Sequence, residues 1–381
     1  MDTVFGADRY PRYAQLRVHE PVSTVIAPPG DIGGGEPMAL ISRYDHVRDA
    51  LTDPRLRVEP PARHQPTVNG GEVPRLLLNT DPPGHTRLRA AVNGLFGRHR
   101  VTMLRPFVEA TANRLLDALP ANATVDLLER FALPLPLTVI CELLGVPAAD
   151  RAPFHGWTRQ LFDAAGDSSD GVGHLHEYLA GLLRRKRSEP GDDLTSELLA
   201  RPHDLTDPEL VGTLLLLLVA GHETSSNLIG NGLLALLTHP AQLARLRHEP
   251  GLIVDAVEEL LRFDSPVAHA VPRYATEDLE IGGVKIAAGS TVLLALGSAN
   301  HDMTLADGLD VSRLPTRHLA FGHGPHYCLG APLARLEGQV AFRTLLRRLP
   351  RLALAVPATS LRWRTSLTMR GLVELPVRIF G

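Results

Sequence analysis

Residues 321–330 read F-G-H-G-P-H-Y-C-L-G, and A-P-L-A-R follows at 331–335. The glycines permit backbone conformations that other residues avoid, so this loop can pass close to a flat object. We expect a helix to begin just after Cys328, and the unpaired N–H groups of a helix start favour a thiolate. The alternative interpretation is that Cys328 serves as a small buried hydrophobic residue, as lone free cysteines often do.

The composition is that of a folded chain without a strong charge bias. The 381 residues are 44% hydrophobic and 21% charged, and the formal net charge is −3, which excludes a disordered chain and gives no basic excess for nucleic acid. Two cysteines exclude a disulfide framework and a Cys₄ metal site. All cations except Lys186 and Lys285 are arginines, which is typical of a GC-rich genome.

Targeting and membrane signals are absent from the sequence. The N-terminal residues show no basic region followed by an apolar stretch, so they do not form a signal peptide. The longest strongly apolar run, 214–220, is far shorter than the ~20 residues that span a bilayer. We therefore expect a soluble cytoplasmic protein with no membrane anchor.

The pattern of segments predicts an α+β fold that is predominantly α-helical. Strand-like runs at 22–27 and 38–41 and at 267–296 flank a helix-periodic region at about 84–262, and 372–379 closes the chain as a strand. Because strand segments lie toward both ends with helices between them, we expect one domain over residues 1–381 with small β-sheets.

One long helix is sharply bounded in the sequence. Thr206-Asp207-Pro208-Glu209 fits a capping box, and the helical run continues to His239, where Pro240 stops it. Some thirty residues span roughly 45 Å, enough to cross a large domain. A helix that is apolar all round must be buried, so the polar residues 222–227 in its middle require a reason.

The loop at 321–330 resembles the heme-binding loop of cytochromes P450, F-x-x-G-x-x-x-C-x-G with a histidine two residues before the cysteine. This resemblance implies a cytochrome P450 fold and heme b (iron protoporphyrin IX) as the cofactor. It also implies that Cys328 is the axial thiolate ligand of the iron, that His326 contacts a heme propionate, and that Phe321 and Gly322 help to bind the cofactor. Thiolate ligation favours O–O cleavage.

The middle of the long helix resembles the oxygen-activation segment of the same family. Small residues at Ala220 and Gly221 would leave room over the heme face and could open the helix hydrogen-bond ladder to admit water. By resemblance, Thr224 and Glu223 are the alcohol and the acid that deliver protons during catalysis. A capped or solvated polar patch on a helix is the alternative, and such a patch is costly inside a buried segment.

Three further cations correspond to heme-propionate contacts of the family. His85 and Arg89 share one face of a helix that starts after residue 84. Arg273 comes shortly after the helix that carries Glu259. Heme brings two carboxylates into the core, so cations are expected near it.

Glu259 and Arg262 match the family's E-x-x-R motif, whose members share a helix face and can form an ion pair behind the heme loop. Family members usually add an Arg or His to this pair. Gly308 stands where we expect that residue, so either Arg313 or Arg317 replaces it or the triad is incomplete.

The resemblance implies a soluble bacterial, actinomycete-type monooxygenase that inserts one oxygen atom from O₂ into a C–H or C=C bond. No flavin or iron–sulfur segment is present, so a separate ferredoxin and ferredoxin reductase would supply electrons. We expect Arg98, Arg100, Arg335 and Arg347 to form the basic patch that docks the ferredoxin.

By position in the fold, the substrate pocket would draw on 60–77, 216–220, 267–271 and 368–369, which are mostly apolar. A lipophilic small molecule, such as a polyketide, macrolide or other secondary metabolite, would suit such a pocket. Two alternative functions stay open: a peroxide-driven heme-thiolate peroxygenase, whose members usually lack the acid–alcohol pair, and a non-catalytic heme-binding sensor.

Overall fold

The computed structural model describes residues 3–6, 9–27, 35–61, 67–68, 71–72, 76–161, 168–302, 308–314 and 316–380. Most of the turn expected between the first two strands, residues 28–34, and much of the expected pocket segment 60–77 lie outside these ranges.

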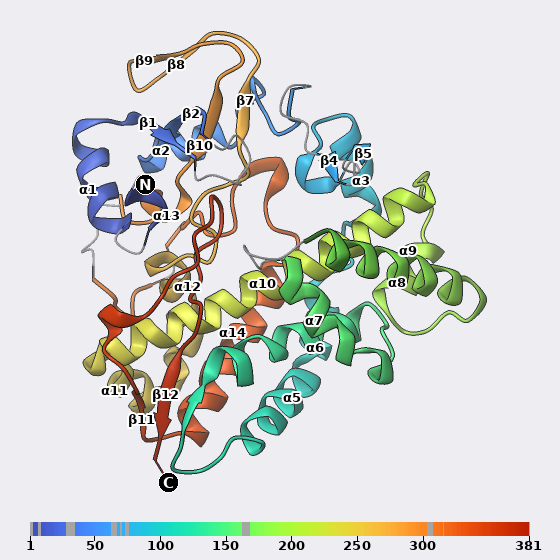
Figure 1. Cartoon of the computed structure of the whole chain (residues 1–381), viewed down its shortest axis with the longest axis vertical. Helices are drawn as coiled ribbons and strands as arrows, with labels where there is room; N and C mark the ends of the chain where they lie inside the picture. The colour runs from blue at the N-terminus through green and yellow to red at the C-terminus, as the bar shows by residue number, and fades with distance from the viewer. Residues whose placement is uncertain are drawn as a thin grey trace.

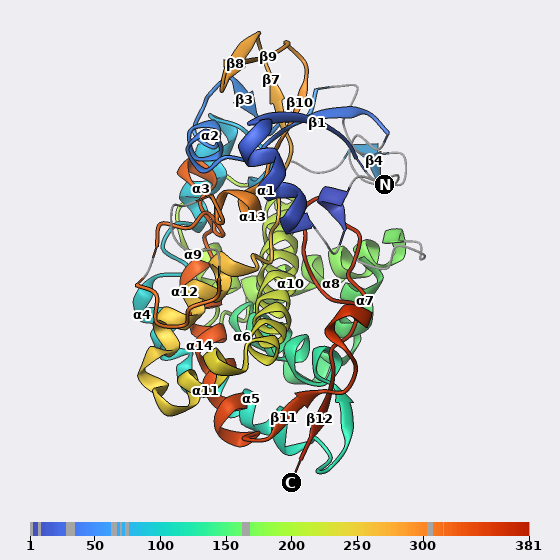
Figure 2. The same cartoon turned by 90° about the vertical axis from the view of Figure 1, so that its left-hand side faces the viewer.

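The long helix α10 (Asp207–Thr238) crosses the centre of the molecule (Figures 1 and 2). Its predicted capping box is confirmed, because the Glu209 N–H donates to Thr206 Oγ1 at 3.4 Å and the Thr206 N–H donates to Glu209 Oε2 at 2.9 Å. Pro240 starts the next helix, α11 (Pro240–His248), as expected for a residue that cannot continue α10.

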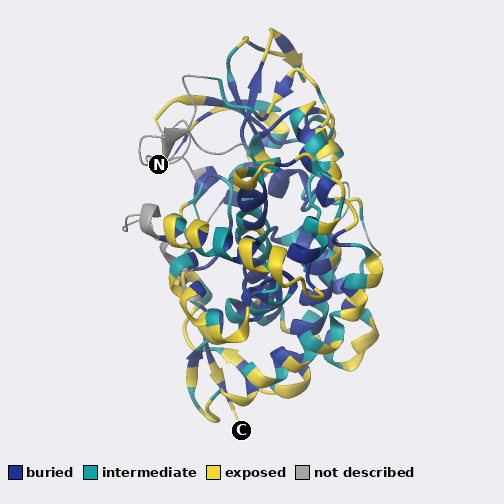
Figure 3. Cartoon of the chain, turned by 90° about the vertical axis from the view of Figure 1, so that its right-hand side faces the viewer, coloured by how far each residue is buried: buried dark blue, intermediate teal, exposed yellow. Residues whose placement is uncertain are grey.

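Other helices cover α10 on several sides. It packs against α6 (Pro134–Leu143), α8 (Ser168–Ser188), α12 (Ile253–Phe263) and α14 (Ala331–Arg348). Figure 3 shows α10 mostly buried in the middle and the peripheral helices with exposed outer faces. The remaining helices are α1 (Arg9–His19), α2 (Tyr44–Ala50), α3 (Gly84–Val92), α4 (Arg98–Met103), α5 (Arg105–Asp117), α7 (Ala152–Leu161), α9 (Leu194–Ala200) and α13 (Leu296–Ala299).

Segments from both ends of the chain share the largest sheet, whose order is β1-β2-β10-β7-β3. Its strands are β1 (Val22–Ile26), β2 (Pro37–Ile41), β3 (Leu56–Arg57), β7 (Arg273–Ala275) and β10 (Thr291–Leu294). The two strands expected at 22–27 and 38–41 are confirmed as β1 and β2, which pair antiparallel, and β10 runs parallel to β2.

The smaller sheets complete the α+β architecture. One has the order β11-β12-β6, with β6 (Thr124–Asp126), β11 (Leu352–Leu354) and β12 (Pro376–Ile379), and the others are the pairs β4 (Thr67–Val68) with β5 (Gly71–Glu72) and β8 (Leu279–Ile281) with β9 (Val284–Ile286). The expected strand at 372–379 is shorter than predicted, because Leu372 forms only an isolated bridge with Trp363. Within the described residues, no helix is long and apolar enough to cross a membrane.

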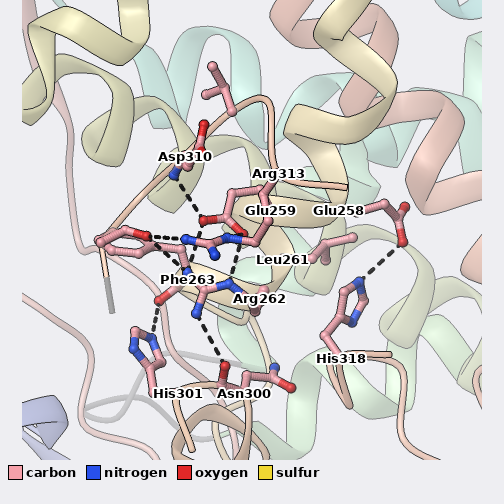
Figure 4. Close-up of polar contacts among 12 residues, drawn as sticks. Glu258, Glu259, Leu261, Arg262, Phe263, Asn300, His301, Asp310, Arg313 and His318 are labelled. Atoms are coloured by element: carbon pink, nitrogen blue, oxygen red, sulfur yellow. Dashed lines mark hydrogen bonds and ion pairs between the residues drawn. The ribbon is translucent and has the colours of Figure 1, made fainter. Parts of the chain in front are cut away.

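Glu259 on α12 is the centre of a buried ion-pair network (Figure 4). Arg262 donates two hydrogen bonds to its carboxylate, at 2.7 and 2.9 Å, and Arg313 Nε donates a third at 3.1 Å. Gly308 contributes its carbonyl oxygen, which accepts from Arg262 at 3.2 Å and from Arg313 at 3.0 Å. The triad is therefore complete, and its third member is Arg313.

Arg313→Leu should lower the free energy of unfolding by about 1–3 kcal/mol, because it leaves a buried carboxylate with one cationic partner instead of two. Urea unfolding measures this change. Arg317→Leu is the matched control: the Arg317 side chain is exposed, so we expect less than about 0.5 kcal/mol. Equal losses in the two variants would contradict the assignment of Arg313 to the triad.

Candidate active site

The loop that carries Cys328 is held by its own backbone. The Cys328 N–H donates to the Phe321 carbonyl at 3.0 Å, and α14 begins at Ala331, as predicted. Gly324 has φ +74, and a Cβ there would lie 2.6 Å from Thr52 Cγ2, so both the conformation and the close approach require glycine. Gly322, with φ +72, is the second left-handed position of the loop.

The environment of the Cys328 thiol contains opposing influences. The side chain is half-buried, and burial raises its pKa. The N–H groups of Gly330 and Ala331 and the charges of Arg89 and Arg335 act in the opposite direction and favour the thiolate. These hydrogen-bond donors and positive charges suit a thiolate that binds a cationic metal centre.

Three segments bring the expected propionate-binding residues together. His85 and Arg89 come from α3, Arg273 from β7, and His326 from the Cys328 loop. The rings of His85 and His326 lie with centroids 4.2 Å apart, and Arg89 Nη2 donates to the Tyr327 carbonyl at 3.0 Å.

Burial and mutual repulsion dominate this cluster. Burial, followed by the charges of Arg273 and His85, lowers the pKa of His326 to about 4, and burial also lowers the pKa of Arg273. Within the part of the chain that the structure describes, His85 Nε2 and Arg273 Nε are buried without a hydrogen-bond partner. Arg273 Nε is a donor without an acceptor, and His85 Nε2 is one in the tautomer that carries its proton there; the two carboxylates of heme would supply acceptors for both.

The middle of α10, residues 215–224, is only partly buried and includes an accessible stripe along one face. Leu217, Gly221 and Thr224 are partly exposed, and Ala220 is exposed, although α10 lies at the centre of the fold. Thr224 Oγ1 donates to the Ala220 carbonyl at 2.8 Å. The helix is α-helical throughout Asp207–Thr238, so the structure does not show the opened hydrogen-bond ladder that the sequence suggested.

Gly221 also packs closely against a neighbouring helix. A Cβ on Gly221 would lie 3.2 Å from two side-chain carbons of Ile140 on α6. Its small size therefore permits the close packing of α6 against α10, while Gly221 and Ala220 both lie on the accessible stripe.

Glu223 is buried and ion-paired. Arg364 Nη1 contacts its Oε1 at 2.5 Å, and Asn227 Nδ2 lies 3.5 Å from the same oxygen. Arg364 comes from the C-terminal segment, and Gly371 of that segment packs against Asn227, where a Cβ would approach the amide to 2.2 Å. Sequence reasoning missed Arg364, because no local pattern links it to α10.

Two of the four arginines expected to dock a ferredoxin form ion pairs with other residues of the protein. Arg335 makes two contacts with Glu258, at 2.7 and 2.8 Å, and its guanidinium lies 4.4 Å from the centroid of the Phe321 ring. Arg100 forms an ion pair with Glu197. Arg98 and Arg347 are exposed and form no ion pair with the described residues.

Glu258 connects the helix α12 to the loop. Burial opposes ionisation of this carboxyl, but hydrogen bonds from His318 and Arg335 prevail and lower its pKa to about 2. The charge therefore persists at neutral pH and holds Arg335 over Phe321.

Comparisons with known proteins all indicate the same family. The family model of cytochrome P450 matches residues 153–305 and 307–354. The chain is 46% identical over 386 residues to vitamin D(3) 25-hydroxylase of Pseudonocardia autotrophica, covering 98% of this chain and 94% of that protein. It is 42% identical over 386 residues to cytochrome P450 monooxygenase PikC of Streptomyces venezuelae, covering 98% and 92%.

Solved structures agree with this relationship. The tirandamycin C-bound P450 monooxygenase TamI superimposes with a TM-score of 0.91 at 44% identity, covering 100% of this chain and 99% of that one. The chain therefore belongs to the cytochrome P450 family and is a heme-dependent monooxygenase of the bacterial type.

Proposed function

We propose that this monooxygenase acts as one domain on a lipophilic secondary metabolite of polyketide or macrolide size. The supporting observation is that near full-length relatives include 6-deoxyerythronolide B hydroxylase at 40% identity and mycinamicin IV hydroxylase/epoxidase at 41% identity. The reaction would place one oxygen atom from O₂ into a C–H or C=C bond of such a molecule.

Cys328 would hold the heme iron through its thiolate, with Phe321 and Gly322 in the same loop beside the cofactor. His85, Arg89, Arg273 and His326 would bind the two propionates. The heme would supply the redox chemistry that activates dioxygen. The unpartnered nitrogens of His85 and Arg273 support this arrangement, because carboxylate oxygens would satisfy them.

Thr224 and Glu223 would move protons to the oxygen-binding side of the heme. The Thr224 hydroxyl lies on the accessible stripe of α10. It donates its proton to the Ala220 carbonyl and can accept a hydrogen bond, and rotation of the hydroxyl would free the proton for donation. Glu223 is ion-paired with Arg364 and would resupply protons through water. Arg364 would then act as a positioning residue that fixes the resting place of the carboxylate.

The substrate would lie over the same stripe. Residues 216–220 of α10, 267–271 after α12 and 368–369 near the C-terminus would form the walls. Val267, Ala270, Val271, Thr368 and Met369 are each partly exposed, which supports their placement along a pocket.

Electrons would arrive from a ferredoxin and its reductase in the cytoplasm, where two free cysteines would stay reduced. The peroxygenase alternative would need no such partner. The presence of both Thr224 and Glu223 favours the oxygen-dependent route, and turnover with NADPH through the partners distinguishes it from a peroxygenase or a sensor.

Cys328→Ala should abolish the red-shifted Soret band of the ferrous–CO complex, because that band reports thiolate ligation. Cys141→Ala is the control: Cys141 is fully buried in α6, and burial raises its pKa to about 12. An absorption spectrum of each variant suffices, and a band that survives in Cys328→Ala but is lost in Cys141→Ala would refute the ligand assignment.

Thr224→Val should divert electrons to hydrogen peroxide and lower the product formed per NADPH by about tenfold or more, because a proton donor is lost while the shape is kept. Added hydrogen peroxide should partly restore product. Thr213→Val removes a similar hydroxyl from α10, one that donates to the Glu209 carbonyl at 2.7 Å, and should leave coupling unchanged. Full coupling in Thr224→Val would exclude Thr224 from the proton route.

Charge reversal at Arg98 and Arg347 should slow electron transfer from an acidic ferredoxin, because complementary charge acts mainly on the association rate. The parent rate should fall as ionic strength rises. Arg184→Glu, at an exposed arginine on α8, is the control. A stopped-flow rate that responds to neither salt nor the reversals would rule out this docking patch.

A further inference from the structure

Two chain segments proposed as pocket walls are joined directly by their backbones. The N–H groups of Ala268 and His269 both donate to the Thr368 carbonyl, at 2.8 and 3.2 Å. Val267 forms an antiparallel bridge with Met369, and the Arg370 N–H donates to the Pro266 carbonyl at 2.8 Å. These backbone hydrogen bonds join the two wall segments into one unit.

The His269 side chain adds a further hydrogen bond between the two segments. The ring is fully buried, with Nδ1 2.6 Å from the Leu367 carbonyl and Nε2 2.8 Å from the Tyr13 hydroxyl. A carbonyl can only accept, so Nδ1 carries the proton and Nε2 accepts from Tyr13, whose hydroxyl also lies 3.3 Å from a second acceptor, the Val4 carbonyl. Burial and the charge of Arg9 lower the pKa of His269 to about 3, so the ring is neutral.

Tyr13 comes from α1, the N-terminal helix that lies beside α13 (Figures 1 and 2). It is fully buried in an apolar cluster that also contains Phe5 and Leu367. The Phe5 and His269 ring centroids are 5.6 Å apart. The Leu367 side chain is thus packed against the N-terminal segment while its carbonyl accepts from His269.

A second tyrosine on the same face of α1 reaches the other end of the unit. Tyr10 precedes Tyr13 by three residues, and its hydroxyl donates to Asp264 Oδ1 at 2.9 Å. Arg370 Nε contacts the same oxygen at 2.5 Å. Helix α1 therefore contacts Asp264, three residues before the first wall segment, 267–271. Through His269 it also reaches Leu367, which directly precedes the second wall segment, 368–369.

We propose that Tyr13 and His269 are positioning residues for substrate: their hydrogen bond sets where the joined unit of segments 267–271 and 368–369 lies relative to α1, so that α1 influences which molecules the pocket accepts. This inference rests on the proposed placement of the pocket. The mechanism requires hydrogen bonds because they fix direction, whereas apolar packing alone leaves the neutral imidazole free to tilt between Leu367 and Tyr13.

The test uses the heme-loaded protein and two azoles that bind heme iron from the substrate side, imidazole and 4-phenylimidazole. We expect only the larger azole to reach the walls, so the ratio of the two dissociation constants should report wall position, while heme ligation is common to both. Spectral titration gives each constant. Tyr13→Phe keeps the ring and removes the donor, and His269→Asn keeps a donor toward Leu367 but loses the contact with Tyr13.

We expect each variant to change the ratio about three- to thirtyfold. The double variant should change it no more than either single one, because both substitutions break the same hydrogen bond. Tyr44→Phe is the matched control, since Tyr44 donates to the Arg317 carbonyl at 2.5 Å and lies outside the walls. Its ratio should stay within about twofold of the parent.

Unchanged ratios in Tyr13→Phe and His269→Asn, together with a lower unfolding midpoint, would overturn the inference and leave the pair a purely structural one. Should Tyr13→Phe fail to fold, His269→Asn and His269→Gln decide the matter by the same ratio. A parent protein without the thiolate-type ferrous–CO band would contradict the proposed function itself, whereas a normal band with unchanged ratios contradicts this inference alone.

Discussion

Burial of α10 on both sides of its partly exposed middle is the constraint on which the rest of the structure depends. The helix is too apolar to face water, so other helices must cover it, and its glycines show how closely they do so. A Cβ on Gly232 would lie 2.6 Å from the Phe342 ring on α14, and one on Gly230 would lie 2.5 Å from Leu128. The accessible stripe around Ala220 and Thr224 is the interruption in this packing, and the proposed chemistry lies there.

A second constraint concerns buried charge. A cofactor with two carboxylates in the core requires donors that the protein alone leaves unsatisfied, and His85 and Arg273 carry such atoms. Two structural carboxylates are satisfied by contrast: Glu259 meets Arg262 and Arg313, and Glu258 meets Arg335 and His318. These ion pairs stabilise the fold, whereas the unsatisfied nitrogens of His85 and Arg273 are the ones that we propose bind the cofactor.

Much of this could be predicted from the sequence, because the decisive signals are local. The capping box at Thr206, the helix start after Cys328 and the spacing of His85 and Arg89 each lie within a few residues. The family resemblance of the loop then supplied the order of the remaining motifs.

The rest depends on contacts between residues far apart in the chain. Gly308 occupies the position expected for an arginine yet contributes a carbonyl, and Arg313 reaches Glu259 from further along. Arg364 meets Glu223, and Arg335 meets Glu258, only because the C-terminal segment and α14 pack beside α10 and α12. No periodicity could reveal that Gly221 faces Ile140 on α6.

A crystal structure of the heme-loaded protein tests the central claim most directly, namely that the unsatisfied donors and the Cys328 thiolate together form the cofactor site. We expect Cys328 Sγ bonded to the iron, and propionate oxygens within hydrogen-bond distance of His85 Nε2 and Arg273 Nε. A heme ligated by another residue, or one whose propionates leave both nitrogens without partners, would contradict it.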